Sequence, residues 1–244
     1  GILTYAIIVQ KLILGILVIC FPLIIMIVVY GLRTPRFVYL LYTTYAFFFT
    51  TISRYTHQTK LSVGLDIILV YLFISLLFSS YQKDSNIKIK SAINILTLTY
   101  IAWIIFTLFQ LINPGTKSEG ITVGLRIWVL QIFILYITAS LVSNTPKMLR
   151  QGLITIGIFT IIAFIKLLYQ RYHGFDTAEK YWLYVDGGAS THLISSGIRY
   201  FSYFTDAANF GNLMGGITIV YGIMGFNTKN RILSLFYISI AIMA

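Results

Sequence analysis

Arg199, Asp206 and Asn209 stand directly before a glycine-rich apolar run, in a sequence that has seven acidic residues among 244. Arginine presents a planar fork of N–H groups, which fits a phosphate better than the point charge of a lysine does. The free backbone amides at the start of a helix also favour an anion. The spacing therefore predicts an anion-binding site beside the amino end of the helix that follows Asp206.

The same residues have a structural interpretation. Asp206 precedes the run AANFGNLMGG, where its carboxylate is well placed to cap the free amides of the next helix. Asn209 can reach back in the manner of a capping box, although Glu or Gln is the usual residue at that position. For Arg199 the structural alternative is an ion pair with Asp206 or Asp186. Both interpretations stay open at this point.

Two further charged residues lie next to the start of apolar runs. Asp66, in KLSVGLDIILVYLF, lies six residues past Lys60, and Arg126, in GITVGLRIWVLQ, lies six residues past Gly120. Each is therefore roughly 9 Å in from the start of its span if the span is helical. Burying a charge in hydrocarbon costs about 2.5 to 3.5 kcal/mol even on lenient insertion scales. We therefore expect Asp66 and Arg126 to pair at similar depth beneath one face. An arginine held in this way is also positioned for an anionic ligand.

Histidines are the remaining candidates for chemistry. None of the three lies at metal-ligand spacing from another histidine or from the single cysteine, and no Asp-x-Asp pair is present to hold a divalent ion against a diphosphate. We therefore expect neither a metal site nor a cofactor. His192, in GGASTHLISSGIR, is a candidate general base. The alternative is an ordinary loop histidine.

Helices that cross a membrane must position these residues. Hydrophobic residues make up 58% of the chain and charged residues 10%, whereas a soluble domain carries about a quarter charged residues. Backbone amides cannot stay unpaired in lipid, and the apolar runs lack the alternation of barrel strands. We therefore expect an all-α, polytopic membrane protein that forms one domain over residues 1–244, with seven spans and the start of an eighth. The runs are 12–32, 37–53, 67–82, 91–116, 127–146, 151–165 and 207–228, with the eighth from 232.

The basic residues sort by connection. A net charge of +11 would suggest a nucleic-acid partner in a soluble protein, but here alternate connections hold most of the basic residues, which is the pattern of cytoplasmic loops. These residues are Arg33, Arg36, Lys83, Lys88, Lys90, Lys147, Arg150, Lys229 and Arg231. The charge therefore favours orientation in the membrane over nucleic-acid binding. The other connections, with the aromatic-rich loop 171–206, are expected to face outward and to pack at the membrane interface.

The stretch RYFSYFTDAANFGNLMGG resembles a pattern of the bacterial O-antigen ligase and O-antigen polymerase family. In that family an Arg, a Phe, an acidic or amide residue and an Asn stand at the outer mouth of a span. Here these residues are Arg199, Phe204, Asp206 and Asn209. The stretch NPGTKSEGITVGLR, which ends at Arg126, is similar to the preceding outward loop of many ligase-like members.

Two features differ from the family pattern. Ala208 stands where a Pro commonly precedes the Asn, and the family's larger outward loop, which holds its proposed catalytic histidine, would lie beyond Ala244. Since Gly1 is not an initiator methionine and the final run 232–244 is shorter than a span, we expect the chain to be a fragment of a longer protein.

The resemblance implies a GT-C-like fold in the bacterial inner membrane, with the active face toward the periplasm. It implies a metal-independent glycosyltransferase that moves a glycan from a polyprenyl-diphosphate carrier to a glycan or lipid A core acceptor. His192 would be the base within this chain, although the main base would lie beyond Ala244. The substrate-binding residues would be Asp66, Arg126, Arg199, Asp206 and Asn209.

Two other functions stay open. A transporter or flippase for an anionic or lipid-linked substrate also places arginines and broken helices near a cavity. A non-catalytic membrane scaffold or sensor subunit would leave Asp66 and Arg126 as a mutual pair with no ligand. A polar cluster near one face favours the enzyme, because transporter sites lie near the midplane of the membrane.

Overall fold

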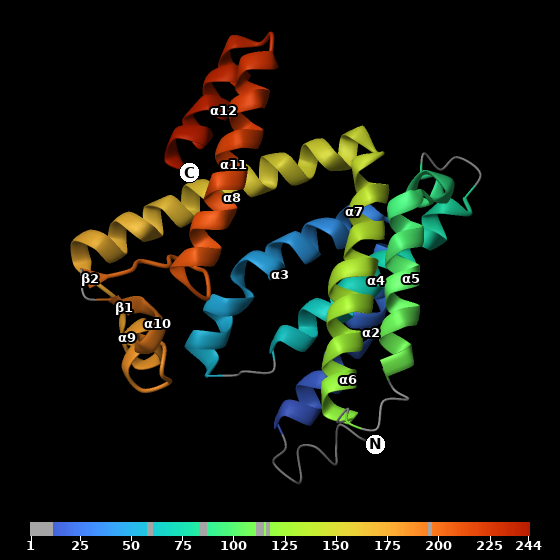
Figure 1. Ribbon diagram of the computed structural model, residues 1–244, viewed down its shortest axis with the longest axis horizontal. Coiled ribbons are helices and arrows are strands. Elements are labelled where there is room, and N and C mark those ends of the chain that lie inside the picture. The colour runs from blue at the N-terminus through green and yellow to red at the C-terminus, as the bar shows by residue number, and fades with distance from the viewer. Residues whose placement is uncertain (1–11, 58–60, 83–86, 111–114, 116–117, 195–196) are drawn as a thin grey trace. The chain divides into compact units, whose positions relative to one another are not determined.

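The fold is mostly helical. The computed structural model describes residues 12–57, 61–82, 87–110, 115, 118–194 and 197–244, and helices account for 84% of the structure (Figure 1). The strands of the described part are β1 (Leu193–Ile194) and β2 (Gly197–Ile198), which pair antiparallel. The all-α prediction is therefore confirmed.

The chain divides into two compact units. The first holds the described residues up to Tyr39 together with Asp66–Met148, and the second holds Leu40–Leu65 together with Leu149–Ala244. The second unit contains the loop 171–206, which was predicted to face outward, and the first contains Asp66 and Arg126.

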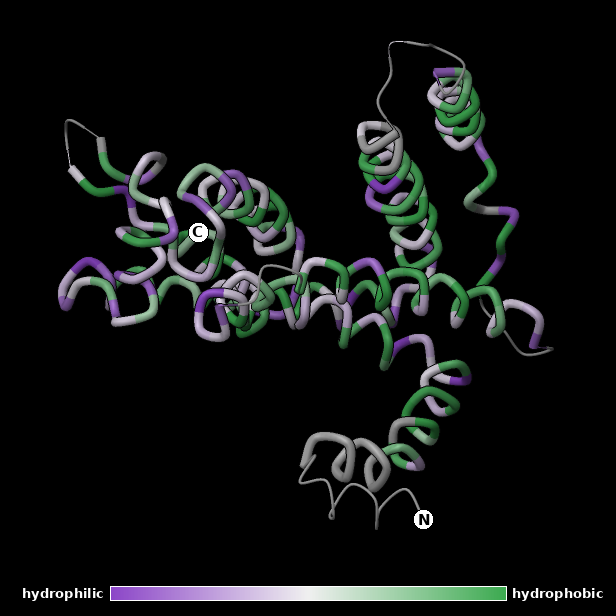
Figure 2. The backbone as a smooth tube through the Cα atoms, turned by 90° about the horizontal axis from the view of Figure 1, so that it is seen from below, coloured by the Kyte–Doolittle hydropathy of each residue, from purple (hydrophilic) through white to green (hydrophobic). Residues whose placement is uncertain are grey.

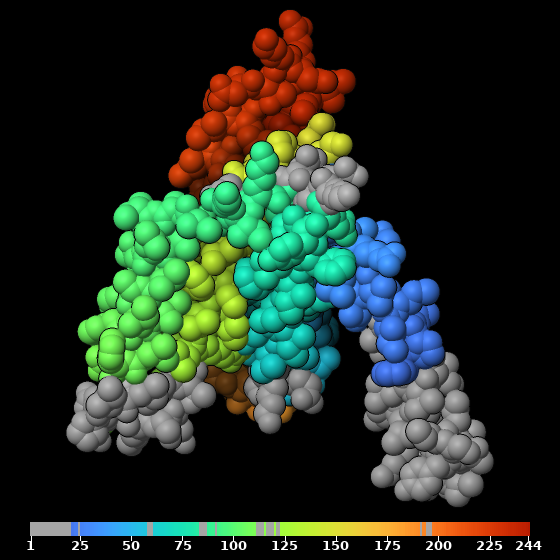
Figure 3. All heavy atoms as spheres, turned by 90° about the vertical axis from the view of Figure 1, so that its right-hand side faces the viewer, coloured from blue at the N-terminus to red at the C-terminus, as the bar shows by residue number. Residues whose placement is uncertain are grey.

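The first unit is built from helices that follow the predicted apolar runs. α6, η4 and α7 continue one into the next, and η4 is a π-helical segment inside this long helix. Figure 3 shows α4, α5 and this long helix side by side. The elements are α2 (Leu12–Arg33), the start of α3 (Pro35–Thr56), α4 (Ser62–Ser80), η2 (Ile89–Ala92), α5 (Ile95–Phe109), α6 (Ser118–Leu125), η4 (Arg126–Ile134) and α7 (Leu135–Ser143).

A close approach at Gly31 joins α4 to the end of α2. The hydroxyl of Tyr71 donates to the carbonyl of Val28 at 2.7 Å, and Ser75 Oγ donates to the carbonyl of Gly31 at 2.6 Å. A Cβ at position 31 would overlap the hydroxyl of Tyr71, so glycine allows the contact. This packing fixes the end of α2, where Arg33 lies.

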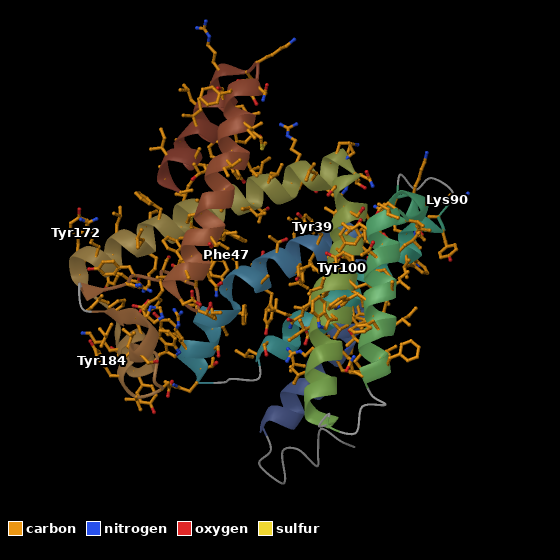
Figure 4. All side chains as sticks on the ribbon, in the orientation of Figure 1. Tyr39, Phe47, Lys90, Tyr100, Tyr172 and Tyr184 are labelled. Carbon is orange, nitrogen blue, oxygen red and sulfur yellow. The ribbon has the colours of Figure 1, made fainter. Side chains whose placement is uncertain are left out.

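Capping and a side-chain contact hold α5 against α7. The side chain of Asn94 caps α5 by accepting from the amide of Thr97 at 3.1 Å. The side-chain amide of Asn94, through Nδ2, also donates to the hydroxyl of Tyr136 at 2.8 Å. The rings of Tyr136 and Tyr100 lie 5.2 Å apart, and Tyr100 is labelled in Figure 4.

The second unit combines long helices with a short, ordered segment. α11 and α12 form a helical hairpin in Figure 1, and Ile238 of α12 packs against Gly225 of α11. A Cβ at Gly211, Gly215 or Gly222 would meet no atom of the described structure, so the small residues of α11 serve close packing at Gly225 alone here. The elements are α3 beyond Tyr39, α8 (Pro146–His173), α9 (Thr177–Tyr184), α10 (Ala189–His192), β1, β2, α11 (Ala207–Asn227) and α12 (Arg231–Met243).

Aromatic rings form the core of the second unit. Phe47 of α3, labelled in Figure 4, lies 5.0 Å from Phe159 of α8 and 5.3 Å from Phe204, measured between ring centroids. The buried Met214 and Tyr221 of α11 belong to the same cluster. This core sets the end of α3 beside the segment that precedes α11.

Several helices are suited to a membrane. Three described helices are long and apolar enough to cross one: Ser62–Ser80, Val123–Ser143 and Pro146–His173. A fourth span results if the residues of α2 and α3, which Thr34 separates, count as one broken span. Figure 2 shows that hydrophobic residues predominate along the helices. The chain is thus consistent with a membrane protein.

The finer count of seven spans and an eighth is not confirmed. α5 has 15 residues and α12 has 13, which correspond to about 22 Å and 20 Å of helix, shorter than the roughly 30 Å of hydrocarbon. The predicted run 91–116 holds part of η2 and α5 in place of one long helix. α8, by contrast, continues past the predicted end at residue 165, so Lys166 lies within the helix.

Candidate functional site

Asp66 and Arg126 form the predicted ion pair in the first unit. Arg126 Nε lies 2.5 Å from Asp66 Oδ2, and Gln131 Nε2 lies 3.5 Å from Asp66 Oδ1. Asp66 is buried and Arg126 is half-buried. Arg126 is also the first residue of the π-helical segment η4, a geometry that often occurs at functional positions. The pairing prediction is confirmed, and a role in ligand binding stays a prediction.

Asp206 and Asn209 cap α11 in the second unit. Asp206 Oδ1 accepts from the amide of Asn209 at 2.7 Å, which confirms the predicted cap. Asn209 departs from a capping box, because its side-chain amide donates to Asp206 Oδ2 at 2.7 Å and to Thr205 Oγ1 at 2.8 Å. Both side chains therefore already have partners at the amino end of the helix.

Arg199 is exposed. Its backbone amide donates to the carbonyl of His192 at 2.9 Å, next to the β1–β2 pair. The predicted alternative, an ion pair with Asp206 or Asp186, does not form between these described side chains. The guanidinium thus keeps its donors available.

His192 is buried against aromatic rings. Its side chain lies 4.7 Å from the ring of Phe201 and 5.2 Å from that of Trp182, and the residue is 1% exposed. Nε2 lies 3.3 Å from the carbonyl of Thr205, which assigns the ring proton to Nε2, while Nδ1 has no hydrogen-bond partner among the described residues. Burial lowers the pKa of His192, so the ring is neutral. In this arrangement His192 packs as a ring and does not present a base.

The sequence did not single out Arg54, the cation at the centre of the second unit's site. Its guanidinium carbon lies 4.5 Å from the ring centroid of Trp182 and 4.4 Å from that of Phe201. Arg54 also donates to the carbonyls of Ser202, at 3.4 Å, and Phe204. The residue is only 5% exposed, so these contacts and the nearby charges of Glu179 and Asp176 compensate for its burial. The contacts join α3 to the segment before α11.

Lys166 was also missed, because the predicted span ended before it. Its ammonium lies 2.8 Å from Asp176 Oδ2 and 3.0 Å from Glu179 Oε1, and Tyr55 donates to Asp176 at 2.5 Å. Asp176 and Glu179 form a capping box on α9. Burial alone would raise the pKa of Asp176, but hydrogen bonds from Lys166, Tyr55 and the backbone amide of Glu179 outweigh it, and the pKa is lowered. This network anchors α9 to the end of α8.

Gln170 connects that network to the segment before α11. Gln170 Nε2 donates to Glu179 Oε1 at 2.9 Å, and Gln170 Oε1 accepts from the backbone amide of Ser202 at 2.9 Å. Ser202 Oγ donates to the carbonyl of Ala163 at 2.7 Å. The backbone of Ser202 has a φ of 51°, which a non-glycine residue rarely adopts, and these bonds hold it there.

A cavity of about 470 Å³ lies at this end of the second unit. We call it the aromatic pocket, and its lining combines aromatic faces with hydroxyl groups, a histidine and a carboxylate. The ring of His57 lies 4.6 Å from that of Tyr181, edge to face. The lining residues are Phe49, Thr50, Ser53, Arg54, His57, Tyr181, Trp182, Asp186 and Thr205.

The predicted site residues fall in both units. Asp66 and Arg126 belong to the first, whereas His192, Arg199, Asp206 and Asn209 belong to the second. A cavity shared by Arg126 and Arg199 therefore stays a prediction. Tyr172 and Tyr184, 75% and 61% exposed, extend outward from the second unit (Figure 4), as expected for side chains at a membrane interface.

Among the described residues, no group of three or more His, Cys, Asp or Glu side chains is placed to hold a metal ion. No protein-family model, curated protein or solved structure matches the chain.

Proposed function

We propose that the chain is a membrane-embedded glycosyltransferase that moves a glycan from a polyprenyl-diphosphate carrier to a glycan or lipid A core acceptor. The observation that carries the proposal is the aromatic pocket, which is lined partly by the segment that resembles the O-antigen ligase and polymerase family. The resemblance supports a GT-C-like fold in the bacterial inner membrane, with this pocket toward the periplasm.

The lining of the pocket suits a sugar. Tyr181 is exposed and offers an aromatic face for the apolar C–H face of a sugar ring, and its polar tip tolerates a wet site. The ring of Trp182 already carries the guanidinium of Arg54 and supports the pocket wall. The hydroxyl protons of Thr50 and Thr205 are donated to the Tyr203 carbonyl and to Asp206, so their oxygens can accept from sugar hydroxyls. A volume of about 470 Å³ falls within the usual range of small-molecule sites.

The carrier's diphosphate needs a cation with free donors. Arg54 lines the pocket, but its guanidinium lies against the rings of Trp182 and Phe201 and donates to two carbonyls. Arg199 is exposed, lacks an ion-pair partner among the described residues, and lies on the segment that contributes Thr205 to the pocket. Arg199 would therefore bind the phosphate oxygens and stabilise the charge that develops as the glycosidic bond breaks.

The general base within this chain would be His57. His57 lines the pocket and is exposed, whereas the ring of His192 is buried outside the lining. The backbone of His57 has a φ of 53°, and such conformations in non-glycine residues cluster at functional sites. The exposed imidazole can accept the proton of the acceptor hydroxyl as that oxygen attacks the sugar.

The test is glycan transfer from a purified polyprenyl-diphosphate-linked donor, measured with the full-length protein in proteoliposomes. His57→Gln should lower the transfer rate by about a hundredfold or more, the usual contribution of a general base. His173→Gln is the matched control, because His173 is exposed at the end of α8 and does not line the pocket. Equal rates for the two variants would remove His57 from the mechanism, and a wild-type protein that transfers no glycan would overturn the proposed activity.

A transporter or flippase is the second candidate function, and one break in the helices favours it. Thr34 separates α2 from α3, and the two helices are strongly bent at this point. Discontinuous helices of this kind often line substrate sites in transporters. The same proteoliposomes distinguish the functions, since a flippase moves the lipid-linked glycan across the bilayer and leaves its bond to the carrier intact.

A further inference from the structure

A second cavity, of about 480 Å³, lies in the first unit. We call it the arginine pocket. Three chain connections meet there: the turn between α2 and α3, the end of α4 with the chain that follows it, and the turn between α7 and α8. The polar residues of its lining are Arg33, Thr34, Arg36, Ser79, Gln82 and Thr145.

A tight turn presents the two arginines. Thr34 is the one residue between α2 and α3, and its hydroxyl donates to the carbonyl of Tyr30 at 2.6 Å. The amide of Phe37 donates back to the carbonyl of Thr34 at 2.9 Å, and the rings of Tyr30 and Phe37 lie 5.5 Å apart, edge to face. Pro35 at the first position of α3 suits a helix start. Arg33 and Arg36 therefore project from a fixed support.

The base of the arginine pocket is buried and partly polar. Ser79, Thr145 and Met148 are 9%, 7% and 1% exposed. Thr145 Oγ1 donates its proton to the carbonyl of Leu141, so its oxygen can still accept a hydrogen bond but has no proton left to donate. Gln82 adds an exposed side-chain amide at the end of α4.

The electrostatic balance of the arginine pocket is positive. Its described lining includes Arg33 and Arg36 and no carboxylate, and neither arginine has an ion-pair partner among the described residues. In the sequence, the connections next to this lining carry Lys88 and Lys147 together with one acid, Asp84. Two arginines in one pocket repel each other, and an anion that binds both removes this repulsion. The planar forks of two arginines match the oxygens of a phosphate group.

We propose that the arginine pocket binds a phosphate group, as an anionic lipid headgroup or as a free phosphate compound, at the membrane face where the basic connections gather. Tyr30 and Phe37 contribute apolar surface to the same lining and are 56% and 36% exposed, so an acyl chain has a surface to follow. Basic pockets between membrane helices on the cytoplasmic side recognise anionic headgroups in this way. The site is separate from the aromatic pocket, and the proposal stands without the proposed enzymatic activity.

The experiment compares two double variants of the full-length protein in detergent. Arg33→Gln with Arg36→Gln removes both forks, while Lys229→Gln with Arg231→Gln removes the same charge from the exposed α11–α12 turn, outside the pocket. Dissociation constants are measured for phosphatidic acid, for phosphatidylcholine with the same acyl chains, and for inorganic phosphate. The pocket variant should bind phosphatidic acid at least about tenfold more weakly than wild type, and the control about as well as wild type.

The three ligands separate the sources of the phosphate. If inorganic phosphate binds alone and competes with phosphatidic acid, with both effects lost in the pocket variant, then a free phosphate compound is sufficient. If only phosphatidic acid binds, the ligand is a lipid headgroup. Equal weakening in both double variants, wild-type affinity in the pocket variant, or no preference for phosphatidic acid over phosphatidylcholine would overturn the proposal.

Discussion

Arginines in the two units lie in opposite surroundings. Arg54 is buried against the rings of Trp182 and Phe201 and donates to backbone carbonyls, whereas Arg33 and Arg36 are exposed and have no ion-pair partner among the described residues. A buried cation is retained only where its charge and donors are compensated, so its contacts stabilise the fold. An exposed cation without such contacts has donors left for a ligand. The comparison therefore distinguishes the two kinds of arginine. A structural arginine donates its N–H groups within the protein, whereas a ligand-binding arginine has N–H groups that are still available.

The largest expected effect comes from removing the compensated cation. Arg54→Ala leaves the carbonyls of Ser202 and Phe204 without this donor and removes the cation from the faces of two rings, so we expect a loss of about 3 kcal/mol in the free energy of unfolding. Arg36→Ala, at an exposed position, should change it by less than about 0.5 kcal/mol. Tryptophan fluorescence during unfolding in detergent measures both, since Trp182 lies against Arg54. Equal values for the two variants would break the comparison.

Local rules and the need for charge compensation made part of the site predictable from sequence. The cap of Asp206 follows from residue type and position at a helix start, and the Asp66–Arg126 pair follows from the expense of an isolated charge in lipid. Arg54 could not be assigned in this way, because its partners Trp182 and Phe201 are distant in the sequence and only packing brings them together. Two features of the sequence could have pointed to Arg54. It directly follows the apolar run 37–53, and the segment 171–206 is rich in aromatic residues that can pack against a cation.

Helical content was predictable from composition, but helix ends were not. The apolar run 151–165 ends before Lys166, whereas α8 continues to His173. Lys166 is accommodated within the helix because it pairs with Asp176 and Glu179, which lie beyond the helix end. The run 91–116 shows the opposite error, since the structure forms η2 and the shorter helix α5 there. A run of apolar residues indicates burial or lipid contact, and tertiary partners decide where the helix begins and ends.

The second expected effect concerns an arginine with free donors in the same unit as Arg54. Arg199→Ala should lower glycan transfer by about a hundredfold or more, the usual result of removing a donor that stabilises developing charge, while the amount of folded protein in the membrane stays the same. Arg199→Lys should restore little, because a point charge does not replace the planar fork. Arg150→Ala, at another exposed arginine, is the matched control. Wild-type transfer by Arg199→Ala at equal abundance would show that exposure and free donors do not identify the arginine that binds the substrate.

The smallest expected effect concerns His192, a buried histidine that can be compared with the buried Arg54. Its Nδ1 has no hydrogen-bond partner among the described residues, and its ring is neutral. Burial lowers the pKa of His192 below the ordinary value of about 6.5, so the unfolded chain binds the proton at a higher pH than the folded protein does. The contribution of His192 to stability is therefore complete above about pH 6.5 and is lost as the pH falls toward the lowered pKa.

His192→Phe tests this sign. The phenylalanine ring still packs against Trp182 and Phe201, but it does not titrate, and it loses the contact with the Thr205 carbonyl, worth about 1 kcal/mol. The free energy of unfolding should then fall less steeply between about pH 7 and pH 5 in the variant than in wild type. His173→Phe, at an exposed histidine, is the matched control for the substitution itself. An unchanged slope in His192→Phe would mean that the buried ring does not titrate differently in the folded and unfolded states. A folded variant that transfers no glycan would return His192 to the list of catalytic candidates.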